Sequence, residues 1–69
     1  MFLRFRDKER GIILQVPFNN QNYIPPIPGK GDVLTLKIGP AEREFIVLDR
    51  HFYFDMLGVE GVELEVEVA

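Results

Sequence analysis

Apolar and polar residues alternate along most of the chain, and no long window shows the spacing of three to four residues that marks an amphipathic helix. The clearest alternation lies at residues 62–68, where Val62, Leu64, Val66 and Val68 are separated by glutamates. This pattern predicts a strand with one buried face and one acidic face in water. Shorter patterns of the same kind predict strands at residues 2–6, 12–18, 33–38 and 42–53.

The segments between these strands have the composition of turns. Residues 7–11 are charged and end in Gly11, which can adopt the positive φ that a tight hairpin needs. Residues 29–32 and 39–41 contain glycine and also predict turns. Residues 55–61 form the last connection, with room for one helical turn.

Two segments depart from simple alternation. The pattern in residues 42–53 changes register near Asp49 and Arg50, which predicts a β-bulge. Residues 23–28 contain three prolines, so we expect them to be extended and to lie against the body of the domain.

Some predicted strands carry apolar side chains on both faces. Alternation places Ile12 on one face with Leu14 and places Ile13 on the other, and Phe45 and Ile46 are likewise adjacent. A small barrel buries only one face of its sheet. We therefore expect loops, a second copy of the chain or another protein to cover the other face.

Charge differs between the two ends of the chain. Residues 1–10 sum to +2 and residues 51–69 to −5. This asymmetry predicts that the terminal strands pair and close the sheet, with Arg4 and Arg6 opposite acidic side chains, each pair worth roughly 0.2–1 kcal/mol. The acidic side chains are Glu63, Glu65 and Glu67.

Composition excludes several kinds of chemistry. The 69 residues contain no Ser and no Cys, Thr35 is the only Thr, and His51 is the only His. No Ser–His or Cys–His pair and no multi-histidine metal site can be built from this inventory. No phosphate-binding glycine motif is present either. We therefore predict a protein that is not an enzyme and has no catalytic residues, metal or cofactor.

Localisation and partner class are predicted from the same inventory. No stretch approaches the roughly 20 apolar residues that span a bilayer, and the chain lacks cysteine, so we expect a cytoplasmic protein without a membrane partner. The net charge of −3 disfavours a dedicated nucleic-acid binder.

These features predict an all-β fold, a single domain over residues 1–69 in which five to six short antiparallel strands form a small barrel. Residues 24–36 and 43–48 resemble small SH3-like barrel proteins of bacteria and phages, with a proline-containing approach, a Gly31-Asp32 turn and apolar strands. The resemblance implies an SH3-like barrel with a non-catalytic role, such as a phage or mobile-element accessory protein or a subunit of a larger assembly.

Two candidate surfaces for binding another protein follow. Tyr23, Ile24 and Ile27 lie among prolines, and such a rigid ridge would lose little entropy on docking. The alternative is that this segment clamps over one barrel end. His51 and Tyr53 are candidates on the predicted fourth strand.

A nucleic-acid-binding barrel is the alternative function. It would use the basic first hairpin together with Tyr53, whose ring could stack on a base. The basic residues of that hairpin are Arg4, Arg6, Lys8 and Arg10.

Alternation also places Asp49, His51 and Asp55 on one strand face, where they could bind a metal or transfer a proton, although a solvated face is the simpler interpretation. Phe52 and Phe54 are expected in the core, since a small barrel needs bulky side chains to fill it. The glutamate face of the last strand is expected to be solvated, with docking of a basic partner as the alternative.

Overall fold

The computed structural model describes residues 1–17 and 27–69. Within these residues all regular structure is β-strand, which confirms the all-β fold. A helix long and apolar enough to cross a membrane is not found in this part of the chain. The strands are β1 (Phe2–Asp7), β2 (Gly11–Pro17), β3 (Val33–Ile38), β4 (Ala41–Asp55) and β5 (Gly58–Val68).

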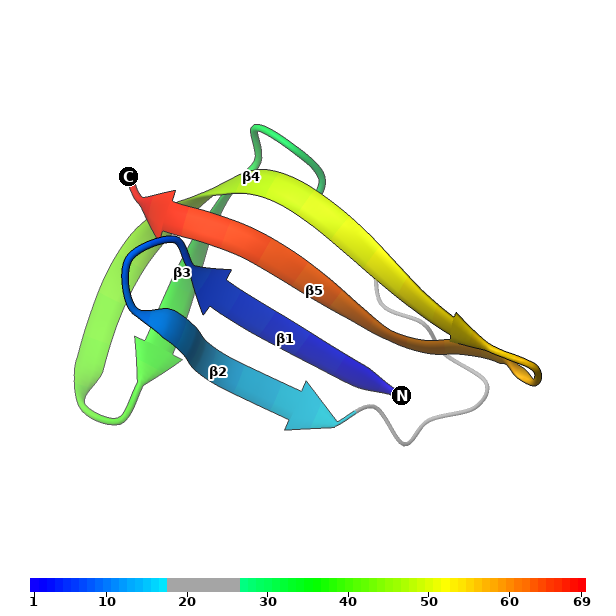
Figure 1. The fold of residues 1–69 in the computed structure, drawn as a ribbon. Helices are drawn as coiled ribbons and strands as arrows, with labels where there is room; N and C mark the ends of the chain where they lie inside the picture. Colours follow the sequence, from blue (N-terminus) through cyan, green and yellow to red (C-terminus); the bar gives the residue numbers. More distant parts are fainter. Residues whose placement is uncertain (18–26) are drawn as a thin grey trace.

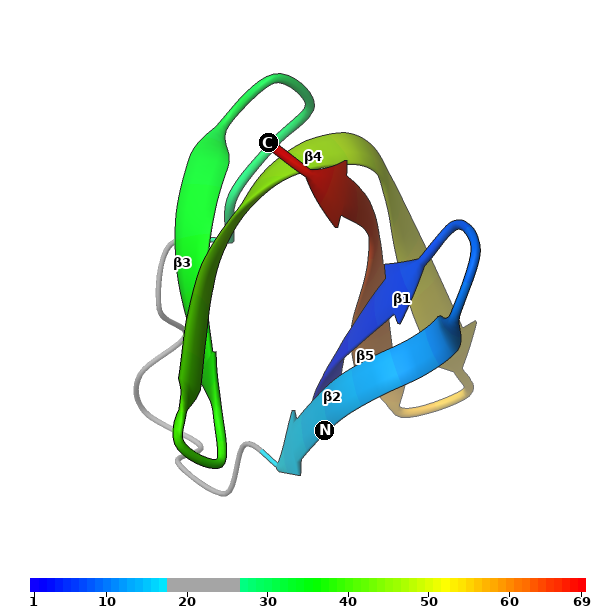
Figure 2. The same cartoon turned by 90° about the vertical axis from the view of Figure 1, so that its left-hand side faces the viewer.

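The strands form one sheet in the order β2-β1-β5-β4-β3, which curls into a half-barrel (Figures 1 and 2). The β1–β2 hairpin and the β3-β4-β5 meander are antiparallel. They are joined by a ladder between β1 and β5, in which Arg4 lies opposite Glu63 and Arg6 opposite Glu65. The predicted pairing of the terminal strands is therefore confirmed.

The pairing of the terminal strands differs from expectation in two respects. Each strand from β1 to β5 runs opposite to the strand before it, so β1 and β5 run in the same direction and their ladder is parallel. The pairing also does not close the sheet, since β1 and β5 occupy its middle and leave β2 and β3 as the edges. Figure 2 shows these edge strands facing each other across the open side of the half-barrel.

The core fills the concave side of the sheet. Val62, Leu64 and Val66 are 0% exposed, as their alternation predicted. Val68 is 42% exposed, against expectation, because the β1–β5 ladder ends at Val66 and no β1 residue lies beside Val68. The buried apolar residues are Phe5, Leu36, Phe45, Val47, Val62, Leu64 and Val66.

A bulge in β2 explains part of the double-faced apolar pattern. The β1–β2 register shifts between Phe5 and Arg6, which leaves Ile13 as an extra residue. Ile13 and Leu14 consequently both pack against the core. The predicted grouping of Ile12 with Leu14 was wrong, because Ile12 lies opposite Arg6 and is half exposed. The expected bulge in β4 is present one residue earlier than predicted, at Leu48, between Val47 and Asp49.

The far end of the β4–β5 hairpin extends beyond the rest of the sheet. We call residues 52–60 the arm, which projects in yellow and orange in Figure 1. The β1–β5 ladder starts at Gly61, and the β3–β4 ladder reaches only Ile46, so beyond the Tyr53–Gly61 pair the two strands of the arm pair only with each other among the described residues. The helical turn and the long connection predicted at residues 55–61 were wrong, because β5 already begins at Gly58.

Local chemistry explains the tight turn of the arm. The carboxylate of Asp55 accepts a hydrogen bond of 2.7 Å from the backbone N–H of Leu57. Gly58 follows with a φ of 131°, a conformation that other residues rarely adopt. A two-residue turn at Met56 and Leu57 therefore replaces the predicted loop.

Candidate protein-interaction surfaces

Arg4 is held on the convex face of the sheet between two aromatic rings. Its guanidinium carbon lies 4.7 Å from the centroid of the Phe2 ring and 5.4 Å from that of Tyr53. Its Nε donates a hydrogen bond of 2.7 Å to Oε1 of Glu63. Gly61 completes the group, because the Phe2 ring covers the place that a Cβ at residue 61 would take. We call these five residues the arginine cluster.

Glu63 is the charged centre of the arginine cluster. Arg6 Nε also donates to Oε1 of Glu63, at 3.2 Å. Desolvation of the Glu63 carboxyl would raise its pKa, but the hydrogen bonds and charges of Arg4 and Arg6 outweigh it and hold the pKa below its ordinary value. Two of the cations proposed for nucleic-acid binding are thus engaged with a carboxylate. The other two, Lys8 and Arg10, lie in the exposed β1–β2 turn.

His51 and Tyr53 lie next to each other on the same convex face. Their ring centroids are 4.7 Å apart, and His51 is exposed whereas Tyr53 is half-buried against Phe2. Asp49 lies opposite Glu65 on this face, but Asp55 is in the arm turn, where it accepts the Leu57 N–H. Among residues 1–17 and 27–69, no three His, Cys, Asp or Glu side chains lie close enough to hold a metal ion.

The proline-rich segment is only partly described. Tyr23 and Ile24 lie outside the described residues. Ile27 is half-buried and packs against the core, and its carbonyl accepts a hydrogen bond of 3.4 Å from Nη1 of Arg50. The part of the segment that the structure describes therefore lies against the body of the domain, as expected.

The arm is the most exposed apolar part of the described structure. Met56 is 101% and Leu57 96% exposed, and Phe54 is 68% exposed. The prediction that Phe52 and Phe54 fill the core was wrong. Phe54 lies on the arm beyond the start of β1, and Phe52, opposite Val62, is 39% exposed. Their ring centroids are 6.4 Å apart. Sequence reasoning missed this surface, although the adjacent Met56 and Leu57 in a predicted connection were a signal of it.

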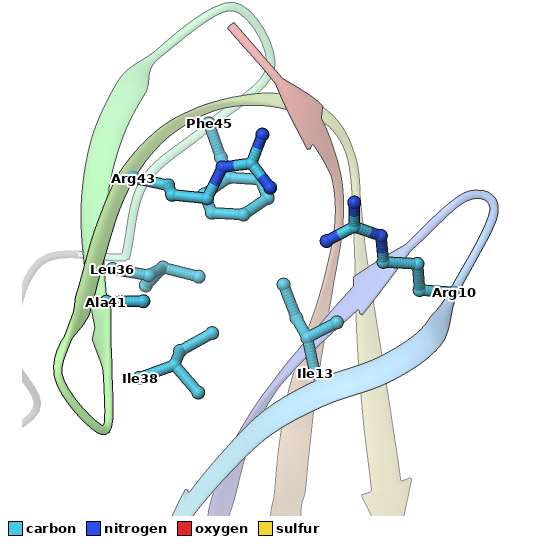
Figure 3. Close-up of a pocket in the computed structure, with 7 residues that line it drawn as sticks. All are labelled: Arg10, Ile13, Leu36, Ile38, Ala41, Arg43 and Phe45. Atoms are coloured by element: carbon cyan, nitrogen blue, oxygen red, sulfur yellow. The ribbon is translucent and has the colours of Figure 1, made fainter.

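A cavity of about 290 Å³ opens on the concave side, between the two edge strands. Arg10 and Arg43 approach it from opposite walls, and their guanidinium groups point toward one another across the opening (Figure 3). Neither arginine forms an ion pair with a described residue. We call this cavity the half-barrel pocket. Its apolar lining consists of Ile13, Leu36, Ile38, Ala41 and Phe45.

Comparisons with known proteins found no match to this chain among protein-family models, curated proteins or solved structures.

Proposed function

We propose that this protein is a non-enzymatic, cytoplasmic protein-interaction module that joins a larger assembly by inserting its arm into a partner. The observation that supports this proposal is the almost complete exposure of Met56 and Leu57 at the tip of the β4–β5 hairpin. Large apolar side chains grouped at an exposed site are typical of a protein-binding surface. The convex tip fits a partner that offers a concave site.

The strand pairing of the arm supports the same proposal. A two-stranded ribbon is only marginally stable in water unless a third strand or another packed surface supports it. Beyond the Tyr53–Gly61 pair, residues 54–60 have neither within the described residues, and Phe54 and Val59 are 68% and 38% exposed. Contact with a partner would supply the packing that the sheet itself does not provide.

The polar residues of the arm indicate the chemistry of that partner. Asp55 and Glu60 are exposed carboxylates beside the apolar tip. An apolar groove with basic groups on its rim would bury Met56 and Leu57 and also neutralise both carboxylates. The partner we propose is therefore a protein with a concave, apolar, positively rimmed site.

A tagged chain immobilised in a lysate of its native host tests the proposal. We expect the wild type to retain at least one protein that the double variant Met56→Glu/Leu57→Glu does not retain. The retained protein can be an untagged copy of this chain or a different protein. Val33→Glu is the matched control, because Val33 is 60% exposed on another part of the sheet. Retention of the same proteins by the arm variant would refute the proposal.

Nucleic-acid binding by the basic hairpin is the alternative proposal. Lys8 and Arg10 support it because they are exposed, but Arg4 and Arg6 share the carboxylate of Glu63. A binder of this kind would be retained on heparin and released by salt, since phosphate contacts depend steeply on ionic strength. Salt-sensitive retention that Lys8→Gln/Arg10→Gln abolishes would favour this alternative over the arm.

A further inference from the structure

We propose that the partner of the arm is a second copy of this chain, whose half-barrel pocket receives the tip of the arm. This inference rests on the proposed function, because it names the partner for the same surface. Copies joined in this way associate head to tail, with the arm of each chain in the pocket of the next.

The two surfaces match in apolar character. The half-barrel pocket presents the side chains of Ile13, Leu36 and Ile38 across an opening of about 290 Å³. The tip of the arm presents Met56 and Leu57, both exposed over nearly their whole surface. Burial of these side chains in the pocket would remove apolar surface of both partners from water.

The two surfaces also match in charge. Arg10 and Arg43 stand on opposite walls of the pocket opening with no ion pair to any described residue (Figure 3). Asp55 and Glu60 flank the apolar tip of the arm, so an inserted tip brings two carboxylates to two guanidinium groups. Charge-assisted contacts between guanidinium and carboxylate groups are among the stronger hydrogen bonds in proteins.

The edges of the sheet add a third reason. β2 and β3 are edge strands on either side of the pocket, and neither pairs with a further strand among residues 1–17 and 27–69. Such edges are templates for pairing with a strand from another chain. An inserted ribbon places its own backbone groups beside them.

The positions of the two surfaces determine the kind of assembly. The arm and the β3–β4 end of the sheet that lines the pocket lie at opposite ends of the molecule in Figure 1. The arm therefore cannot reach the pocket of its own chain, and the contact joins two different surfaces. Such a contact repeats from copy to copy and builds rings or open chains.

Sedimentation velocity over micromolar to millimolar concentrations tests the inference. We expect the mass of the wild type to rise from the monomer mass of 8.0 kDa to at least twice that value. The tip variant Met56→Glu/Leu57→Glu replaces the apolar side chains of the arm tip by carboxylates. The pocket variant Arg10→Glu/Arg43→Glu reverses the charge at the pocket opening. Each of these variants alone is expected to remain a monomer. Circular dichroism of each variant tests whether it is folded.

Mixing the two variants is the decisive measurement. The tip variant keeps an intact pocket, and the pocket variant keeps an intact arm. In an equimolar mixture the arm of the pocket variant is therefore expected to enter the pocket of the tip variant, which gives a complex of two chains that grows no further. A symmetric contact between two arms would give no complex in this mixture. Glu44→Lys is the control, because Glu44 is exposed on the inner strand β4 and does not line the pocket, and this variant is expected to associate as the wild type does.

Three results would overturn the inference: a wild type that stays monomeric, tip or pocket variants that still associate, or a mixture that forms no complex. The proposed function is tested separately by capture from the host lysate. Arm-dependent capture of a different protein by a monomeric chain would refute self-insertion and leave the proposed function standing. Capture that does not depend on the arm would refute the proposed function itself.

Discussion

Gly61 in the arginine cluster provides a sharp test of the packing on the convex face. A Cβ built on Gly61 would lie 2.3 Å from Cδ2 and Cε2 of the Phe2 ring, closer than real Cβ atoms come to other heavy atoms. In Gly61→Ala the ring must therefore move, and its contacts with Tyr53 and the Arg4 guanidinium move with it.

The size of the effect follows from two opposing terms. Insertion of an extra methyl group into a packed site costs about 1–3 kcal/mol. Replacement of a glycine by alanine inside a strand contributes about 0.5–1 kcal/mol in the opposite direction. We therefore expect Gly61→Ala to lower the free energy of unfolding by up to about 2.5 kcal/mol.

A double-mutant cycle with Phe2→Ala isolates this contact. The three heavy atoms nearest to the new methyl group all belong to the Phe2 ring, so without the ring Gly61→Ala should stabilise the Phe2→Ala protein by about 0.5–1 kcal/mol. Urea unfolding followed by far-ultraviolet circular dichroism on the four proteins gives the coupling energy. Destabilisation of the same size in both backgrounds would refute the idea that the Phe2 ring occupies the space above Gly61.

Three further substitutions test the core, the first turn and the ion pairs. Leu64→Ala removes a side chain that is 0% exposed and should cost about 2–5 kcal/mol, enough to unfold much of a domain this small, as circular dichroism would show. Asp7→Ala removes the buried acceptor for the backbone N–H groups of Glu9 and Arg10 and should cost about 1.5–3 kcal/mol in urea unfolding, whereas Asp7→Asn should cost less. Glu63→Gln should weaken the fall in the free energy of unfolding at acid pH. The pKa of Glu63 is lowered in the folded protein, so the ionised carboxylate stabilises the fold fully above its ordinary pKa near 4.5. This stabilisation is lost as the pH falls through the lower pKa of the folded protein.

Each of these expectations has a contrary outcome. A Leu64→Ala protein as stable as the wild type would contradict the placement of β5 in the centre of the core. Equal stability of the alanine and asparagine variants at residue 7 would show that the acceptor oxygen has no role in the turn. An unchanged acid limb in Glu63→Gln would mean that the ion pairs with Arg4 and Arg6 do not stabilise the folded chain.

The course of the strands was predictable because alternation reports directly on a face of a sheet. Leu64 and its neighbours in β5 are buried as their spacing indicated, and the opposite charges of Arg4 and Glu63 correctly indicated that the terminal strands pair. Such patterns depend on single residues and their neighbours in the sequence, so they can be interpreted without knowledge of the tertiary structure.

Features that depend on register between distant strands were not predictable. Ile13 turns toward the core because a bulge shifts β2 against β1, and nothing in residues 12–18 alone shows that shift. Phe54 lies outside the core because β1 begins opposite Gly61, a fact that depends on residues far away in the sequence. The half-barrel pocket was missed for the same reason, since Arg10 and Arg43 meet only when the sheet curls.

The parallel ladder between β1 and β5 has a consequence for how the chain folds. It joins residues separated by almost the whole length of the protein, as in the Arg4–Glu63 pair, whose members are 59 positions apart in the sequence. Contacts of such long range close last and slow folding, because the loop entropy must be lost before they form. The hairpin and the meander can each form from neighbouring residues. Their docking along β1 and β5 is therefore the expected rate-limiting step, and substitutions in that ladder should change the refolding rate more than substitutions in either hairpin turn.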